Sequence, residues 1–163
     1  MDTDYDFKHV EQGLEATMTE FEDISRSLHP CLAFLTRWGY RPLPDEVCHS
    51  TLLGDQLLIR YVSNSFGRDV RIHFSSATAT HASRFSVFVG SRDGQNLFVN
   101  DYLARRGRQN VSQSFINSVP EKTIAMFCGD VASILRLEFE TKLADFVQGK
   151  AWNSPVFDWE HYK

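Results

Sequence analysis

Apolar residues in the first thirty positions of the chain recur at the spacing of one helix face. The step is three or four residues throughout, which is typical of an amphipathic helix. Pro30 is expected to end or kink this helix, because proline lacks the N–H and its ring clashes with the preceding turn. A short continuation should stop at Gly39, so residues 1–38 are predicted to be helical. The stripe consists of Phe7, Val10, Leu14, Met18, Phe21, Ile24 and Leu28.

From Glu46 onward the hydrophobic period changes to two, which is typical of strands with one buried face. Gly54 and Asp55 form a pair suited to the first hairpin turn. The connections between the strands are short, which favours an antiparallel meander of four to five strands over residues 46–99. The predicted strands cover residues 47–53, 56–62, 70–74, 85–89 and 96–99.

A second long helix is predicted after the meander. Ser118 and Glu121 have the spacing of a capping box, and Pro120 stands near the first helical position. Apolar residues at helical spacing follow as far as Gly149, a plausible helix stop. We therefore expect a helix over residues 119–148.

Helices at both ends and strands between them indicate an α+β fold. We expect a single domain over residues 1–163, in which the meander packs on the long N-terminal and C-terminal helices. The 42% apolar content and the 13 phenylalanines are sufficient for one sizeable core at this length. The tail, residues 151–163, is rich in aromatic side chains, so it is predicted to pack back on the domain.

Charge divides the chain into an acidic start and a basic middle. Residues 1–23 contain eight acidic residues and one basic residue, whereas residues 60–108 contain eight arginines and three acidic residues. Such polarity influences the choice of partner and the rate of association. Glu11, Glu15 and Glu22 fall on one side of the predicted helix. They form the candidate partner-binding patch, and a basic protein is the partner that their charge favours.

A basic loop suggests a different function. Arg105, Arg106 and Arg108 can clamp phosphates, and Tyr102 supplies a nearby ring for stacking on a base. The net charge of −4 argues against nucleic-acid binding by the whole domain. The alternative function is therefore an accessory protein that contacts nucleic acid through this loop, although an exposed loop without a ligand is the simpler interpretation.

His73 is the best candidate for catalysis, because Arg60 and Arg71 are expected beside it on the polar face of the sheet. Ser86 and Phe88 should share that face. No serine-nucleophile, phosphate-loop or dinucleotide-binding motif occurs in the sequence. A small enzyme centred on His73 is the third hypothesis, and a solvated histidine is the simpler interpretation.

No cofactor is expected. Cys31, Cys48 and Cys128 are widely spaced, and no CxxC or Cys/His spacing suggests a metal site. The N-terminus is acidic where a signal peptide needs positive charge, and no stretch approaches the ~18 apolar residues of a membrane span. We therefore expect no membrane contact and a cytoplasmic location.

Two segments, LLIRYVSNSFGRDVRIHF and RFSVFVGSRDGQNLFVNDYLARRG, resemble a loose class of small bacterial α+β proteins. Some similar domains are immunity proteins, which neutralise a toxin from a competing or sister cell. The resemblance covers about residues 34–105, and it implies a fold and a class but no functional residue. It rests on hydrophobic alternation and on Tyr61, Phe98 and the run Asp101, Tyr102 and Leu103.

An immunity protein needs a stable scaffold and a charged surface that complements its toxin, and it needs no chemistry of its own. The acidic face of residues 2–23 suits the basic active-site rim of a nuclease toxin. The sequence therefore favours a non-enzymatic protein-binding module of the immunity or antitoxin type, and leaves its oligomeric state open.

Overall fold

The computed structural model describes residues 4–77, 83–105 and 123–150, with side chains from residue 13 onward. Its longest element is helix α1, Asp4–Cys31, which is followed by the short helix α2, Ala33–Arg37. The predicted end of the first helix is confirmed, since α1 ends one residue after Pro30. Gly39 follows α2 with a φ of 92°, a conformation that glycine adopts without strain.

The sheet is an antiparallel meander, as predicted. It has six strands rather than four to five, because residues 41–42, which precede the predicted meander of residues 46–99, pair with β3. The order is β1-β3-β4-β5-β6, with β2 also paired to β3. The strands are β1 Arg41–Pro42, β2 Glu46–Ser50, β3 Gly54–Ser63, β4 Arg68–Ser75, β5 Arg84–Ser91 and β6 Asn96–Phe98.

The first hairpin turn lies earlier than the sequence suggested. Ser50 pairs with Gly54, so residues 51–53 make the turn and Gly54 begins β3. The Ser50 hydroxyl accepts hydrogen bonds from the backbone N–H groups of Leu52 and Leu53, both at 3.3 Å. This local contact between a side chain and the backbone holds the turn at residues 51–53, and the Gly54–Asp55 pair, on which the prediction rested, does not indicate it.

The C-terminal helix is interrupted. Helix α5, Ile124–Glu140, is capped by the preceding Thr123, whose hydroxyl accepts a hydrogen bond from the Met126 N–H. Helix α6, Ala144–Val147, continues after a break at residues 141–143. The predicted helix 119–148 is therefore two helices, and its first residues lie outside the described part of the chain. A short helix, α3, Val99–Arg105, follows the sheet.

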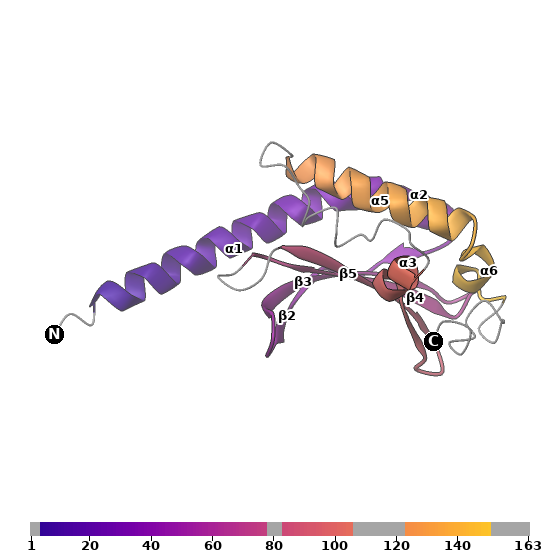
Figure 1. Cartoon of the computed structure of the whole chain (residues 1–163), viewed down its shortest axis with the longest axis horizontal. Coiled ribbons are helices and arrows are strands. Elements are labelled where there is room, and N and C mark those ends of the chain that lie inside the picture. The colour runs from indigo at the N-terminus through magenta and orange to yellow at the C-terminus, as the bar shows by residue number, and fades with distance from the viewer. Residues whose placement is uncertain (1–3, 78–82, 106–122, 151–163) are drawn as a thin grey trace.

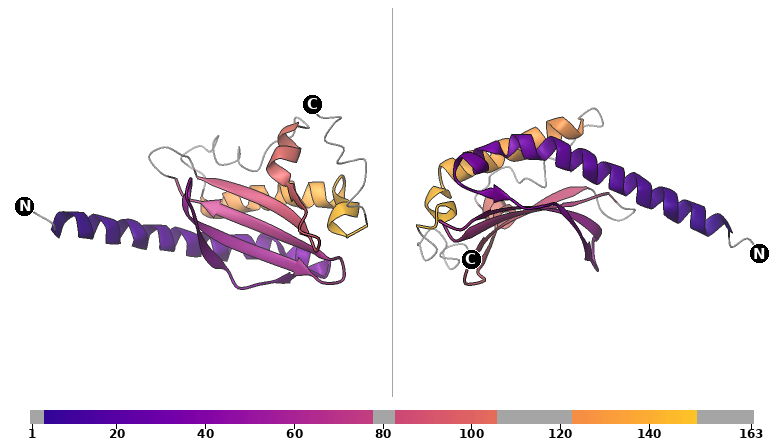
Figure 2. Two further views of the ribbon diagram at one scale, coloured as in Figure 1. Left: turned by 90° about the horizontal axis from the view of Figure 1, so that it is seen from below. Right: turned by 180° about the vertical axis from the view of Figure 1, so that it is seen from behind.

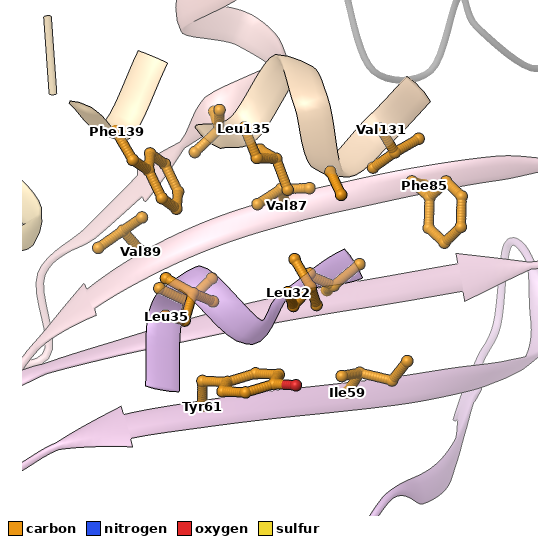
Figure 3. Packing of buried hydrophobic residues seen from close by; sticks show 14 of the residues in the cluster. Leu32, Leu35, Ile59, Tyr61, Phe85, Val87, Val89, Val131, Leu135 and Phe139 are labelled. Atoms are coloured by element: carbon orange, nitrogen blue, oxygen red, sulfur yellow. The ribbon is translucent and has the colours of Figure 1, made fainter. Parts of the chain in front are cut away.

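Helices α1 and α5 lie side by side on one face of the sheet (Figure 1). Apolar side chains from α1, α2, α5 and alternate strand positions fill the space between these layers. Figure 3 labels part of this cluster, which includes Leu35 of α2 and Leu135 of α5. The sheet curves so that its other face is concave, and no helix in the described ranges covers that face (Figure 2). The labelled core residues are Leu32, Leu35, Ile59, Tyr61, Phe85, Val87, Val89, Val131, Leu135 and Phe139.

Candidate functional site

The N-terminal half of α1 projects beyond the sheet and beyond the other helices (Figures 1 and 2). Phe21 is the first of its described side chains to be buried. Met18 and Leu14, about one and two turns earlier on the same stripe, are 41% and 55% exposed. The apolar face of α1 thus runs out of the core into solvent, where a large apolar side chain gains nothing from burial.

Acidic side chains accompany this exposed apolar stripe. Glu15 and Glu22 are both exposed on α1. Glu20 is held by the sheet, because its carboxylate accepts a hydrogen bond of 2.6 Å from the Ser76 hydroxyl. Glu11, the third predicted patch residue, belongs to α1, but its side chain lies outside the described ones. The exposed pair leaves two carboxylates of the predicted patch facing solvent.

A hollow of about 400 Å³ lies between α1 and β2, and we call it the α1–β2 groove. Val47, on the open edge strand, is 49% exposed beside it. Apolar side chains from both elements therefore meet an acidic rim in one place. The groove is lined by Met18, Phe21, Val47 and Leu57 and by Glu22, Ser25, Arg26, Asp45 and Glu46.

A hydrogen-bond network, which includes the groove-lining Ser25 and Asp45, ties α1 to the sheet. His29 lies at its centre, with Nδ1 2.7 Å from the Tyr61 hydroxyl and Nε2 2.9 Å from Asp45 Oδ1. Ser25 donates to Asp45 Oδ2 at 2.5 Å. Because an ionised carboxylate only accepts, we assign the proton of the Asp45 bond to Nε2, and we assign Tyr61 as the donor to Nδ1.

The pKa values of Asp45 and Tyr61 are shifted in this network. Burial alone would raise the pKa of the Asp45 carboxyl, but the hydrogen bonds from His29 and Ser25 outweigh it, so this pKa lies below its ordinary value of 3.8. Burial raises the pKa of Tyr61 to about 12, and the charge of Asp45 adds to this rise. Near neutral pH the network therefore holds an ionised Asp45 and a protonated Tyr61.

This network contains serine, histidine and aspartate, yet its geometry differs from that of a nucleophile with its base. The Ser25 hydroxyl bonds to Asp45 and not to His29, whereas an activated serine needs the base on its own oxygen. Tyr61, which does contact His29, is 2% exposed. The arrangement is therefore suited to holding α1 against the sheet.

On the concave face, the structure brings the three predicted sheet residues onto neighbouring strands. Arg60 and Arg71 are direct cross-strand partners, and the Nε atoms of both lie within 3.4 Å of Asp69 Oδ2. His73 follows two residues after Arg71 on the same face. Its ring meets the Phe88 ring edge-on at 5.6 Å.

His73 also approaches a thiol, with Nδ1 3.9 Å from Cys48 Sγ. Burial lowers the pKa of His73, and the charge of Arg71 lowers it further. Burial also raises the pKa of the Cys48 thiol. A reactive cysteine beside histidine requires the opposite shifts, a thiolate next to an imidazolium. This pair is therefore a neutral contact.

In the structure, the aromatic ring predicted beside the basic loop is not accessible. Tyr102 is 3% exposed and belongs to the core, so its ring is not available to stack on a base; its expected role is corrected accordingly. Arg105 is exposed, and its guanidinium lies 3.6 Å from the Asp101 carboxylate. Arg106 and Arg108 lie outside the described residues.

Within the described ranges, no three His, Cys, Asp or Glu side chains come close enough together to hold a metal ion. The described helices also include none with the length and apolar character that crossing a bilayer requires. Cys31, Cys48 and Cys128 are free thiols.

The His29 network was missed by the sequence analysis, because its members are far apart in the chain. Asp45 is 16 residues from His29, and Tyr61 is 32 residues from it. The one available signal was Tyr61 itself, which alternation places on the buried face. A buried tyrosine hydroxyl requires a hydrogen-bond partner, so a polar group had to face it.

No protein-family model, curated protein or solved structure matches this chain. The resemblance to small bacterial α+β proteins stays a prediction. Any assignment of function consequently depends on the side chains and surfaces described above.

Proposed function

We propose that this chain is a non-enzymatic protein-binding module of the immunity or antitoxin type, which binds a basic protein through α1 and the α1–β2 groove. The observation that carries the proposal is the exposure of Leu14 and Met18 on the projecting half of α1. Contiguous exposed apolar side chains with a polar rim are typical of protein interaction sites.

Charge supports a basic partner. Glu15 and Glu22 flank the apolar stripe on α1, and Glu46 lines the groove from β2. Among the described residues that line the groove, Arg26 is the only basic one, and its Nη1 lies 3.3 Å from Asp23 Oδ1. A surface of one sign raises the rate at which an oppositely charged protein docks.

The size of α1 also suits such an interface. A helix of 28 residues is about 42 Å long, and its N-terminal half projects beyond the described strands and the other described helices. Apolar anchors inside a charged rim are the arrangement that gives an interface both affinity and orientation.

The experiment uses the product of the reading frame adjacent to this gene as the candidate toxin. Its induction in a host cell should arrest growth, and co-expression of this chain should restore it. A toxic product against which this chain gives no protection would contradict the immunity type.

Binding is then measured between the two purified proteins by surface plasmon resonance. In the triple variant Glu11→Lys, Glu15→Lys, Glu22→Lys, the association rate should be lower by about tenfold or more at low salt. The difference from the wild type should shrink as salt is added.

Met18→Ala should instead raise the dissociation rate, because it removes apolar contact. The matched control, Glu140→Lys with Asp145→Lys, reverses exposed acids on the far helices and should leave both rates unchanged. Unchanged rates in the triple variant would remove α1 from the interface.

A further inference from the structure

The concave face of the sheet contains a second, chemically different hollow, of about 340 Å³. Residues of β3 and β4 and the turn between β5 and β6 line it. Of the described lining residues, four are arginines and one is an acid. The guanidinium of Arg68 is directed to α6, where it lies over the Phe146 ring and donates to the Phe146 carbonyl oxygen. Three arginines therefore remain against one acid, so the hollow is basic. We call it the arginine hollow, and its charged residues are Arg60, Arg68, Arg71, Arg92 and Asp69.

The centre of the arginine hollow places like charges in direct opposition. Arg60 on β3 and Arg71 on β4 are cross-strand partners, an arrangement that is unfavourable without a counter-charge. Asp69 supplies that counter-charge to both, with Oδ2 3.4 Å from Arg60 Nε and 3.2 Å from Arg71 Nε. One carboxylate thus faces two guanidinium groups, and a positive charge remains.

The hydrogen-bond donors are also in excess. Each guanidinium has five N–H donors. The Nε atoms of Arg60 and Arg71 are buried and, among the described residues, make no aligned hydrogen bond, even though Asp69 is near. The side chains of Arg60 and Arg71 keep 42% and 28% of their surface exposed. Their outer donors therefore face the solvent in the hollow.

Arg71 is held in one position. Its guanidinium lies over the Phe88 ring, 5.7 Å from the centroid, and donates to Asn96 Oδ1. Phe88 is in turn stacked on Phe98, with the ring centroids 4.8 Å apart. A guanidinium fixed by an aromatic ring and an amide loses little entropy when it binds an anion. Arg92, in the turn between β5 and β6, donates to the Asn64 carbonyl oxygen.

We infer that the arginine hollow binds a multivalent oxyanion, of the phosphate or polycarboxylate class, with Arg71 and Arg60 as its principal donors. Guanidinium groups bind such anions through paired, charge-assisted hydrogen bonds. Asp69 has two opposite effects in this site. It holds the two arginines together in the free protein, and its negative charge repels the anionic ligand. This site is separate from the α1–β2 groove, so the inference does not depend on the proposed function.

The test titrates the full-length protein with inorganic phosphate and, separately, with citrate. Backbone amide NMR shifts are followed, and sodium chloride of matched ionic strength is the reference. At least one of the two anions should saturate a set of shifts on β3, β4 and the β5–β6 turn. Phosphate alone would identify the phosphate class and citrate alone the polycarboxylate class. Shifts no larger than those in chloride, for both anions, would overturn the inference.

Two variants distinguish a binding site from a structural cluster. Arg71→Leu should weaken binding by about tenfold or more, since it removes a charge-assisted donor. Asp69→Asn keeps the shape but removes the opposing charge, so it should tighten binding by about fivefold or more even though it loosens the arginine pair. Weaker binding in Asp69→Asn would contradict the assignment of Asp69.

Arg136→Gln is the matched control, because Arg136 is an exposed arginine on α5 that pairs only with Glu140 in the described contacts. It should leave the titration unchanged. If Arg71→Leu proves unfolded by circular dichroism, Arg71→Lys replaces it and should weaken binding, because lysine lacks the planar fork. Equal affinity in the wild type and in the folded Arg71 variant would overturn the inference.

Discussion

Gly90 on β5 lies directly opposite Asp69 on β4, and its missing side chain leaves the space that the Asp69 carboxylate occupies. A Cβ at position 90 would overlap Asp69 Oδ1 and approach the Arg71 guanidinium. The backbone of Gly90 does not require glycine, since its φ is not positive. This glycine is therefore explained by the Arg60–Asp69–Arg71 cluster and not by a turn.

Gly90→Ala should lower the free energy of unfolding by about 1–3 kcal/mol, the usual cost of forcing an atom into an occupied space. Urea denaturation followed by circular dichroism measures this. Gly129→Ala is the control, because a Cβ there meets nothing within 4 Å and the residue lies inside α5. It should raise the stability by about 0.5–1 kcal/mol. Equal stability of Gly90→Ala and the wild type would show that Asp69 moves aside freely.

Asp45 makes the stability depend on acid pH. Because the pKa of Asp45 is lowered in the folded state, its contribution is fully present above the ordinary value of 3.8 and is lost as pH falls through the lowered pKa. Asp45→Asn should be less stable than the wild type by about 1–3 kcal/mol at pH 7, since it loses hydrogen bonds to a charged group.

The difference between Asp45→Asn and the wild type should shrink as the pH falls below about 4. Urea unfolding at several pH values between 3 and 7 provides the measurement. Asp55→Asn is the control, because Asp55 contacts His49 on an exposed strand end and should cost little at any pH. A stability difference that does not change with pH would contradict the role of the Asp45 charge.

The hydrophobic period predicted much of the fold, because the alternation of apolar and polar residues along a strand determines which of its side chains are buried. Leu57, Ile59 and Tyr61 are all buried, and Arg60 between them faces the concave side, as the alternation indicated. The turn at residues 51–53 and the break at 141–143 were not predicted. Both depend on local hydrogen bonds, such as that from the Thr141 hydroxyl to the Leu137 carbonyl, which leave no hydrophobic signal.

The candidate sites were predicted only in part. Sequence placed Arg60, Arg71 and His73 on one face, yet Asp69, which joins the two arginines, was not singled out. Asp69 directly precedes Val70, which is on the buried face, so strand alternation places Asp69 on the polar face. Its contact with both arginines, however, can be predicted only when the register between β3 and β4 is known. Register depends on long-range pairing and cannot be counted along a single strand.

Tyr61 should make the protein less stable in alkali. Its pKa is raised to about 12 by burial, whereas a tyrosine in the unfolded chain ionises near 10. As the pH rises, Tyr61 ionises in the unfolded chain before it ionises in the folded protein, and this stabilises the unfolded state. The free energy of unfolding should therefore fall between pH 10 and about 12. Tyr61→Phe should show a shallower fall over this range.

At neutral pH, Tyr61→Phe should cost about 0.5–1.5 kcal/mol, the net value of its hydrogen bond to His29. A double-mutant cycle with His29→Ala isolates this pair, and the coupling energy should be of the same size. Coupling near zero, measured by urea unfolding, would show that the hydrogen bond contributes nothing to holding α1 against the sheet.

The pKa of His73 depends in part on the charge of the neighbouring Arg71. Burial first, and then the charge of Arg71, lower the pKa of His73 below the ordinary 6.5. A group with a lowered folded-state pKa contributes stability that is complete above 6.5 and is lost as pH falls through the lowered value. Removing the Arg71 charge should therefore raise the pKa of His73, although burial will keep it below 6.5.

The measurement is an NMR titration of the His73 ring in the wild type, in Arg71→Gln and in Arg136→Gln. The Arg71 variant should shift the midpoint upward, and the Arg136 variant, which lies on α5 and pairs with Glu140, should leave it unchanged. A His73 midpoint at or above 6.5 in the wild type would mean that the ring is solvated and charged near neutrality. It would then be able to serve as the acid–base group of the enzyme hypothesis, which a neutral, half-buried ring beside a protonated Cys48 disfavours.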